Sequence, residues 1–509
     1  MSPAAGSSLE ASLALFGLSA LAGAGGCAAR PPVDEALGIS TPYVVESLDP
    51  HARDLHSEAS VCANLYEPLV ARDAELKLRP ALALRWLSPE PTTWVFELRP
   101  GVRFHDGRVL SAADVVASFE RLQKRPELER GVSAREIESV RSVDPGRVEI
   151  HTRRPVPSLL NALSLIAILP GGQADPERPI GTGPYELVEW KRGDSVRLRR
   201  HDAYWGARPA AKEVVLRLGR TAEQAAADLL SGKSRLAAIA SRQTESALAK
   251  NGAVRVEKRT GLFLKFLGFD LASAAPRDVT GARGNPFKSP LVRRAFSLAI
   301  DRKLLAAGLA EPALPANQPV PPAVFGHNPG LPGLQRDLPR ARELLSQAGY
   351  PDGFEITLRA RRAAGSAGAP VAAMLREIGI RTTLVELDEA AYAASSGGVY
   401  LARLACETGD AADLLSIMVQ SSAAPLVATM QGSGPGFLRA IQESIESDSP
   451  ELRGEALRQI MATAMESLPI VPLYFDEDVY GVSTAWRWRP RADGYVLAAE
   501  AAPLGTGTR

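Results

Sequence analysis

Residues 94–115 of the chain are WVFELRPGVRFHDGRVLSAADV. Bulky apolar side chains alternate with others over residues 94–98, which is the two-residue period of a β-strand. Turn-forming pairs follow at Pro100-Gly101 and Asp106-Gly107. Ser111 then begins a helix, because an acidic residue three positions later completes a capping box and apolar residues continue at helical spacing. The segment therefore predicts a strand, a turn and a helix in direct succession.

The same alternation of strands and helices extends over the rest of the chain. Periodicity and turn residues predict strands at 36–39, 185–190, 195–200, 354–358, 381–387 and 469–474, and helices at 291–305, 338–348, 371–378 and 451–467. The helix at 291–305 begins with a cap and a first-turn proline at Ser289-Pro290. Interleaved strands and helices are typical of the α/β class, which we predict here.

Length and charge narrow the range of functions. The chain has 509 residues, which exceeds a single ordinary core and predicts two or three domains. Lys and Arg total 59 against 58 Asp and Glu, so the net charge is +1. This balance gives no reason to expect a nucleic-acid partner or a polybasic membrane surface.

The N-terminal segment has the pattern of an export signal. Residues 11–24, ASLALFGLSALAGA, are apolar over the length of a signal-peptide core and too short to span a membrane comfortably. The run ends in Ala24-Gly25-Gly26-Cys27, which resembles the bacterial lipobox, although Ala24 stands where leucine is usual and no basic residue precedes the run. We expect residues 1–26 to be a signal peptide and Cys27 to carry a lipid anchor. The alternative is plain signal cleavage beside an incidental cysteine.

Cysteines and histidines give little indication of a metal site. No CxxC pair occurs, so a zinc knuckle or dithiol redox site is not expected. We expect Cys62 and Cys406 to be free and buried, with a disulfide left open. His51 and His56 lie five positions apart and could form half a metal site, but we predict two solvated histidines, no metal and no other cofactor.

Catalytic motifs are missing from the sequence as well. It contains no GxSxG nucleophile elbow and no HExxH pair. Gly232-Lys233-Ser234 hints at a phosphate loop, but Ala227 stands where that loop requires glycine. We therefore predict that the protein is not an enzyme.

Several sequence blocks together resemble the extracellular solute-binding proteins of family 5, the dipeptide, oligopeptide and nickel receptors of ABC importers. The blocks follow the family order from about residue 36 to residue 494. They are SLDP at 47–50, NLYEPL at 64–69, LRPALA at 78–83, the quoted segment 94–115, GTGPY at 181–185, DAYW at 202–205, VRRAF at 292–296, AIDR at 299–302 and AGYPDG at 348–353.

The resemblance implies a two-lobed periplasmic-binding-protein fold of type II, the venus-flytrap arrangement, with an extra subdomain on the first lobe. Lobe one would comprise 33–262 with an inserted subdomain at about 69–180, lobe two 263–469, and residues 470–509 would return to lobe one. Two strands would cross between the lobes near 262–269 and 469–474. A ligand in the cleft would favour the closed form, because only that form contacts it from both lobes.

The resemblance also implies a transport function. We expect the substrate-binding component of an ABC importer, a monomer at the periplasmic or cell surface, that captures a short peptide or peptide-like solute and delivers it to permease and ATPase subunits. Three alternatives remain open. These are a receptor for a nickel chelate, haem or oligosaccharide, a sensory binding protein without an importer, and a hydrolase on the same frame.

In peptide-binding relatives, an aspartate of lobe two in a Trp-x-x-Asp-x-x-Asp-Pro motif pairs with the amino terminus of the ligand. The matching stretch here is ETGDAADL, residues 407–414, which places Asp410 on the ammonium-binding position. Each charge-assisted hydrogen bond of that kind contributes roughly 1.5–3 kcal/mol. The alternative is that Asp410 is a surface or helix-capping residue.

The neighbours of Asp410 complete the predicted site. Glu407 replaces the aromatic residue of the motif and either favours a second cationic group on the ligand or is a solvated loop acid. Thr408 and Gly409 belong to the same predicted ligand-binding loop. Because the aromatic wall is missing, the ligand need not be a typical peptide. On lobe one, we expect Tyr43 to line the cleft.

Overall fold

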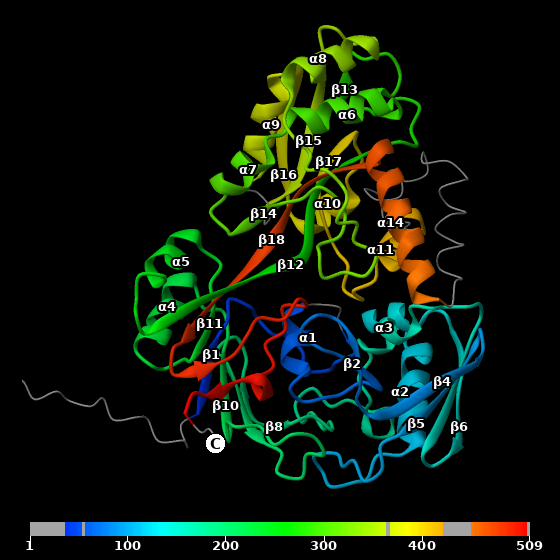
Figure 1. The fold of residues 1–509 in the computed structure, drawn as a ribbon, viewed down its shortest axis with the longest axis vertical. Helices are drawn as coiled ribbons and strands as arrows, with labels where there is room; N and C mark the ends of the chain where they lie inside the picture. The colour runs from blue at the N-terminus through cyan, green and yellow to red at the C-terminus, as the bar shows by residue number, and fades with distance from the viewer. Residues whose placement is uncertain (1–35, 53–55, 363–366, 421–448, 506–509) are drawn as a thin grey trace, which may run out of the picture.

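The computed structural model describes residues 36–52, 56–362, 367–420 and 449–505. The predicted signal peptide and Cys27 lie outside these residues. The chain forms two lobes that are joined by two long strands (Figure 1). Across the described residues, no helix is both long and apolar enough to cross a membrane.

The two connecting strands are β12 (Val254–Phe269) and β18 (Ile470–Ser483). They pair antiparallel along nearly their whole length, from Val254 opposite Ser483 to Gly268 opposite Ile470. Both belong to a 12-stranded sheet with the order β13-β15-β17-β12-β18-β11-β1-β10-β9-β8, in which β16 also pairs with β15 and β14 with β18. Since β18 pairs with β11 at one end and β12 pairs with β17 at the other, the two strands carry the sheet from one lobe into the other.

Lobe one holds the strands on the β11 side of the crossing, with α4 and α5 beside it (Figure 1). Its core is formed by apolar side chains of these strands together with Leu65, Trp486 and Trp488. Its elements are β1 (Leu37–Ser40), α1 (His56–Cys62), β8 (Tyr185–Lys191), β9 (Ser195–Arg200), β10 (Glu213–Arg217), α4 (Ala222–Leu230), β11 (Leu236–Ala238), α5 (Arg242–Leu248), β19 (Trp486–Arg487) and β20 (Ala502–Pro503).

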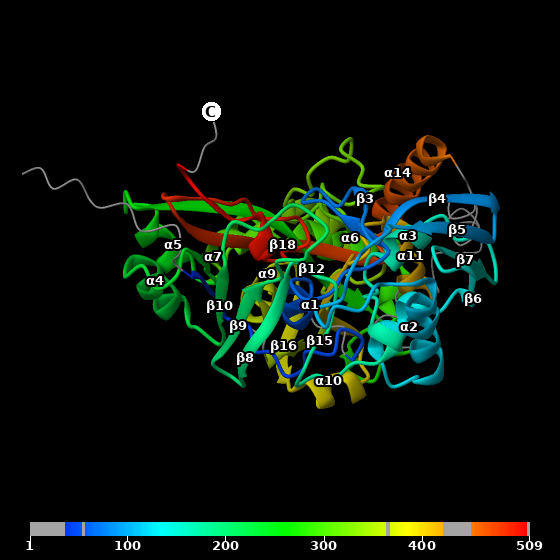
Figure 2. The same cartoon turned by 90° about the horizontal axis from the view of Figure 1, so that it is seen from below.

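A smaller unit with its own core stands beside lobe one. Its four-stranded sheet has the order β4-β5-β7-β6 and packs against α2, and Figure 2 shows it on the far side of the molecule from α4 and α5. The elements are β2 (Val70–Arg72), β3 (Leu78–Pro80), β4 (Ala83–Glu90), β5 (Thr93–Leu98), α2 (Ala112–Lys124), β6 (Ile137–Asp144), β7 (Arg147–Thr152) and α3 (Leu159–Leu163).

The opening segment folds as its pattern predicts. The strand is β5, and Gly101 and Gly107 adopt the positive φ angles of the two predicted turns. The backbone N–H of Ser111 donates to Asp114 Oδ2 at 2.9 Å, which completes the capping box at the start of α2. Helical spacing then directs the apolar side chains of α2 into the core of this unit.

Lobe two holds the strands on the β17 side of the crossing and the helices that cover them. A tight apolar core that includes Phe269, Phe287, Phe296 and Phe354 lies between sheet and helices. The elements are β13 (Val279–Thr280), α6 (Pro290–Ala299), α7 (Arg302–Gly308), β14 (Ala313–Pro315), α8 (Leu338–Gln347), β15 (Phe354–Arg361), α9 (Gly368–Arg376), β16 (Ile380–Leu387), α10 (Glu389–Ala394), β17 (Val399–Ala405), α11 (Ala411–Gln420) and α14 (Pro450–Ser467).

The single helix predicted at 291–305 is wrong, because two helices occupy that stretch. Ile300 is extended, and the Asp301 side chain accepts a hydrogen bond from Leu304 N at 2.9 Å, which caps a new helix, α7. The buried guanidinium of Arg302 donates to Pro472 O at 2.7 Å and to Ser297 O at 3.0 Å. The break therefore lets an arginine bind backbone carbonyls of the crossing strand and of α6.

Candidate functional site

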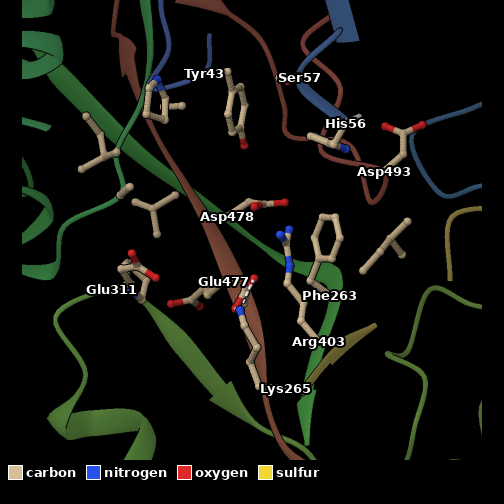
Figure 3. Close-up of a pocket in the computed structure, with 18 of the residues that line it drawn as sticks. Tyr43, His56, Ser57, Phe263, Lys265, Glu311, Arg403, Glu477, Asp478 and Asp493 are labelled. Carbon is tan, nitrogen blue, oxygen red and sulfur yellow. Dashed lines mark hydrogen bonds and ion pairs between the residues drawn. The ribbon is translucent and has the colours of Figure 1, made fainter. Parts of the chain in front are cut away.

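A cavity of about 600 Å³ lies where the two connecting strands cross between the lobes. Figure 3 shows its lining side chains converging from several elements. Volumes of 300–1,000 Å³ are typical of small-molecule sites. The lining residues are Pro42, Tyr43, His56, Ser57 and Ala238–Ala240 from lobe one, Arg361, Glu389, Leu401, Arg403 and Glu407 from lobe two, Leu262, Phe263, Lys265 and Asp476–Tyr480 from the connecting strands, and Glu311, Pro312 and Asp493 from loops.

An irregularity in β12 shapes this cavity. Thr260 pairs with Glu477 and Leu264 pairs with Phe475, so residues 261–263 lie opposite Asp476 alone. Such a bulge interrupts the ladder and redirects side chains, and bulges are common beside functional sites. Phe263 and the acidic segment, residues 476–478, consequently face the cavity.

The carboxylates that face the cavity differ in their partners. Lys265 Nζ lies 3.0 and 3.1 Å from the two oxygens of Asp476. Arg491 binds Asp493 at 2.8 and 2.9 Å. The carboxylate of Asp478 has no hydrogen-bond or ion-pair partner among the described residues. Burial raises the pKa of Asp478 to about 7, repulsion by Asp476 and Asp493 adds to the shift, and Arg403 opposes it.

Aromatic rings form one side of the cavity. The ring of His56 contacts Tyr43 and Phe263 edge to face, with centroids 5.8 and 6.1 Å apart. Burial lowers the pKa of His56 despite the nearby Asp493, which favours the neutral imidazole. The guanidinium of Arg403 stacks 3.4 Å from the centroid of Phe263.

The structure divides the predicted site residues. Tyr43 and Glu407 line the cavity, whereas Thr408, Gly409 and Asp410 do not. Asp410 is 2% exposed, and Arg453 of α14 binds both of its oxygens, at 2.6 and 2.8 Å. Asp410 Oδ1 also accepts a hydrogen bond from Ala412 N at 3.0 Å at the start of α11. The acceptor positions of Asp410 are therefore occupied by groups of its own lobe.

The segment that contains Asp410, residues 407–413, runs from the loop after β17 into the first turn of α11 and contacts the smaller unit beside lobe one. Asn161 Nδ2 donates to Thr408 O at 3.0 Å, and Ser158 Oγ donates to Asp413 Oδ1 at 2.9 Å. Glu407 receives a hydrogen bond from Arg72 on its carbonyl oxygen, and its carboxylate lies 3.6 Å from Arg130. We call these residues the 407–413 loop, and its polar groups connect the two halves of the molecule.

Sequence inspection missed most of the cavity residues. Asp476, Glu477 and Asp478 form an acidic run inside an otherwise apolar strand, IVPLYFDEDVYGV at 470–482. This run could have indicated the cavity. A strand that crosses between lobes is expected to be buried, so charged residues in it suggest that it faces a site. Phe263 and Arg403 carried no comparable indication.

Two predictions about side chains outside the cavity have clear outcomes. Cys62 and Cys406 are free and buried, as expected. The prediction that His51 is solvated is wrong: it is fully buried and its Nε2 donates to Ala167 O at 2.8 Å. Within the described ranges, no group of three or more His, Cys, Asp and Glu side chains could hold a metal ion.

Comparison with known proteins agrees with this geometry. A family model described as bacterial extracellular solute-binding proteins, family 5 Middle, matches residues 77–424. The chain belongs to this family. It is therefore a solute-binding protein, and the resemblance inferred from the sequence blocks is confirmed.

Individual relatives extend the comparison. The glutathione-binding protein GsiB of Salmonella typhi is 29% identical over 373 residues, which cover 69% of each chain. NikA from Brucella suis, solved in complex with Fe(III)-EDTA, has a TM-score of 0.80 at 24% identity and covers 92% of this chain and 100% of its own. The periplasmic binding protein DppA from Helicobacter pylori, solved with the peptide STSA, has a TM-score of 0.75 at 23% identity, covering 92% and 98%. These likenesses confirm the predicted two-lobed α/β fold.

Proposed function

We propose that this family 5 protein is the substrate-binding component of an ABC importer and captures a short peptide or peptide-like solute in the cavity at the crossing strands. The observation that carries the proposal is the cavity of about 600 Å³ lined by residues of both lobes. The glutathione-binding and peptide-bound relatives support a peptide-like ligand. In this proposal lobe one comprises 33–262 and 470–509, with a subdomain at 69–180, and lobe two comprises 263–469.

The cavity explains how capture would be coupled to transport. A solute that contacts Tyr43 and Asp478 on one side and Arg403 on the other gains its full contacts only when the lobes are closed. Such a ligand shifts the equilibrium toward the closed form, which is the form presented to the permease and ATPase subunits. The protein binds and releases its solute without chemical change.

A thermal-shift screen with glutathione and a library of di- to pentapeptides tests this proposal. A ligand at one hundred times its Kd stabilises the folded protein by about 2.7 kcal/mol. We expect a rise in Tm with some of these peptides, a smaller radius of gyration by X-ray scattering, and recovery of the peptide intact. No shift with any peptide, or cleavage of the bound peptide, would contradict the proposal.

The same proposal places the protein at the periplasmic or cell surface, as a monomer held to the membrane through a lipid on Cys27. The apolar run before Cys27 and the extracellular character of the family support this placement. Cys27→Ser should move the protein from the membrane fraction to the soluble exported fraction, and light scattering of that soluble form should give a monomer mass. Retention of the variant in the membrane fraction would argue against the anchor.

A further inference from the structure

Two carboxylates that line the cavity form no ion pair with a described residue: Glu311, which is exposed, and Asp478, which is partly buried. Asp476 is bound by Lys265 and Asp493 by Arg491, at distances of 2.8 to 3.1 Å. Asp478 forms no such pair with any residue that the structure describes. A charged carboxylate that is shielded from water is costly unless it is paired, so this position favours an incoming cation.

The backbone around Asp478 leaves room for its carboxylate beside the cavity. A Cβ on Gly494 would lie 3.0 Å from Asp478 Oδ2, and a Cβ on Gly261 would lie 3.3 Å from it. The Gly494 φ angle of +70° independently favours glycine. Two glycines therefore form a niche for this carboxylate, and its open side is the cavity.

A second polar group faces the same space. Figure 3 shows the Tyr43 hydroxyl directed toward the part of the cavity where Asp478 lies. That hydroxyl has no hydrogen-bond partner among residues 36–52, 56–362, 367–420 and 449–505. The Tyr43 ring itself offers a face to a cation. An acceptor, a hydroxyl and an aromatic ring thus converge on one point.

The opposite charge is supplied by lobe two. Arg403 stacks on Phe263, which holds its guanidinium in place, and it forms no ion pair with a described carboxylate. Figure 3 shows this guanidinium directed into the same cavity as the Asp478 carboxylate. A cation and an anion, neither of them in an ion pair with a described residue, therefore face one cavity from the two halves of the molecule.

We propose that Asp478, with Tyr43, binds a cationic nitrogen of the solute and that Arg403 binds its carboxylate, so that the ligand is a zwitterion that connects the two lobes. The inference rests on the proposed function and specifies the ligand class of the same cavity. It moves the ammonium site from the 407–413 loop to the connecting strand β18. Guanidinium–carboxylate pairing on the lobe two side completes the recognition.

Calorimetric titration of three proteins tests the proposal: the wild type, Asp478→Asn and a matched control, Glu67→Gln. Glu67 is likewise a buried carboxylate whose pKa burial raises to about 7, but it accepts hydrogen bonds from Tyr204 and Trp205, both at 2.9 Å, away from the cavity. The probes are peptides found by the thermal-shift screen, their N-acetylated forms and their C-terminal amides. A second panel holds arginine, lysine and agmatine, which are cations without a peptide bond.

We expect Asp478→Asn to weaken binding of free-amine peptides at least tenfold, and Glu67→Gln to change it less than threefold. N-acetylation should weaken wild-type binding at least tenfold and abolish the difference between the wild type and Asp478→Asn. Amidation of the C-terminus should weaken binding to the wild type. Arg403→Gln should remove this difference in affinity between the free peptide and its C-terminal amide.

The outcomes separate this inference from the proposed function. If peptides bind but neither N-acetylation nor Asp478→Asn changes their affinity, the inference is wrong and the proposed function as a peptide receptor is retained. If only members of the second panel bind, and Asp478→Asn abolishes that binding, the Asp478 site stands and the peptide function is wrong. If neither panel binds the wild type, both are wrong.

Discussion

The 407–413 loop and the acidic segment at 476–478 both place carboxylates near the crossing strands, but the fold uses them differently. In the loop, Asp410 is bound by Arg453, and Asp413 accepts a hydrogen bond from Ser158. In the acidic segment, Asp478 faces the cavity without a described partner. A carboxylate can serve a ligand only where the protein has not already provided its counter-ion. Position in a family motif does not decide this, because the partner comes from elsewhere in the chain.

The largest expected effect concerns the pair between Asp410 and Arg453. Asp410→Ala leaves the guanidinium of Arg453 buried and unpaired, which typically costs 3–5 kcal/mol, whichever member of such a pair is removed. We expect the free energy of unfolding, measured by urea titration, to fall by about that amount while peptide affinity in the folded protein changes little. Glu455→Ala, an exposed position on the same helix α14, should change stability by about 0.5 kcal/mol or less.

The opposite pattern would break the comparison between the two regions. If Asp410→Ala abolishes peptide binding and leaves the unfolding free energy unchanged, the loop aspartate is the ammonium site that the family motif predicts.

The next effect is the pH dependence of the free energy of unfolding that the titration of Asp478 causes. Its folded pKa of about 7 lies above the unfolded value, so the folded protein binds more protons than the unfolded chain between pH 4 and 7. Wild-type stability therefore falls as pH rises through this window. The carboxyl faces Asp476 and Glu477 of its own strand, Arg403 of β17, Asp493, and the rings of Tyr43 and His56.

Asp478→Asn removes this titration. Urea unfolding from pH 4 to 8 should show equal stabilities near pH 4 and a variant that is more stable by on the order of 2 kcal/mol near pH 8, since each pKa unit is worth about 1.4 kcal/mol and partial exposure reduces the total. Other groups with raised pKa values, such as Glu67 and Asp413, titrate alike in both proteins. A stability difference that is independent of pH would show that Asp478 is ionised normally.

The smallest effect concerns the contacts of the 407–413 loop with the subdomain. Ser158→Ala and Asn161→Ala each remove one hydrogen bond to this loop, and each should cost about 1 kcal/mol. In the double variant without ligand, we expect X-ray scattering to report a larger radius of gyration. Ser164→Ala is the control, because Ser164 Oγ donates to Asn161 O within the smaller unit and does not reach the loop. Equal radii for all three proteins would mean that these bonds do not hold the lobes together.

Local elements of the fold were predictable because their causes lie within a few residues. The capping box between Ser111 and Asp114 spans three positions and forms as expected. The hairpin of β8 and β9 turns at Lys191-Arg192-Gly193-Asp194, and Gly193 adopts the positive φ angle that such a turn requires. The break between α6 and α7 escaped prediction, because Arg302 is held by Pro472 O, 170 residues away along the chain.

The candidate site was predictable only in part for the same reason. Tyr43 and Glu407 lie at the cavity, and their predicted role in ligand binding stays a prediction. Nothing in ETGDAADL indicates that Arg453 will occupy the carboxylate of Asp410. The acidic run at 476–478 can be seen in the sequence. The bulge in β12, which interrupts the β12–β18 pairing opposite Asp476, cannot.

By itself, the sequence determined the order of most strands and helices, because period, caps and turns act between neighbouring residues. The family and its two lobes followed from the resemblance of the sequence blocks. Tertiary structure alone decided which charges remain available to a solute. Arg453 pairs with Asp410 across 43 residues, and Lys265 pairs with Asp476 across 211. Electrostatic pairing depends on distance in space, and folding brings together charges whose separation along the chain carries no record of that proximity.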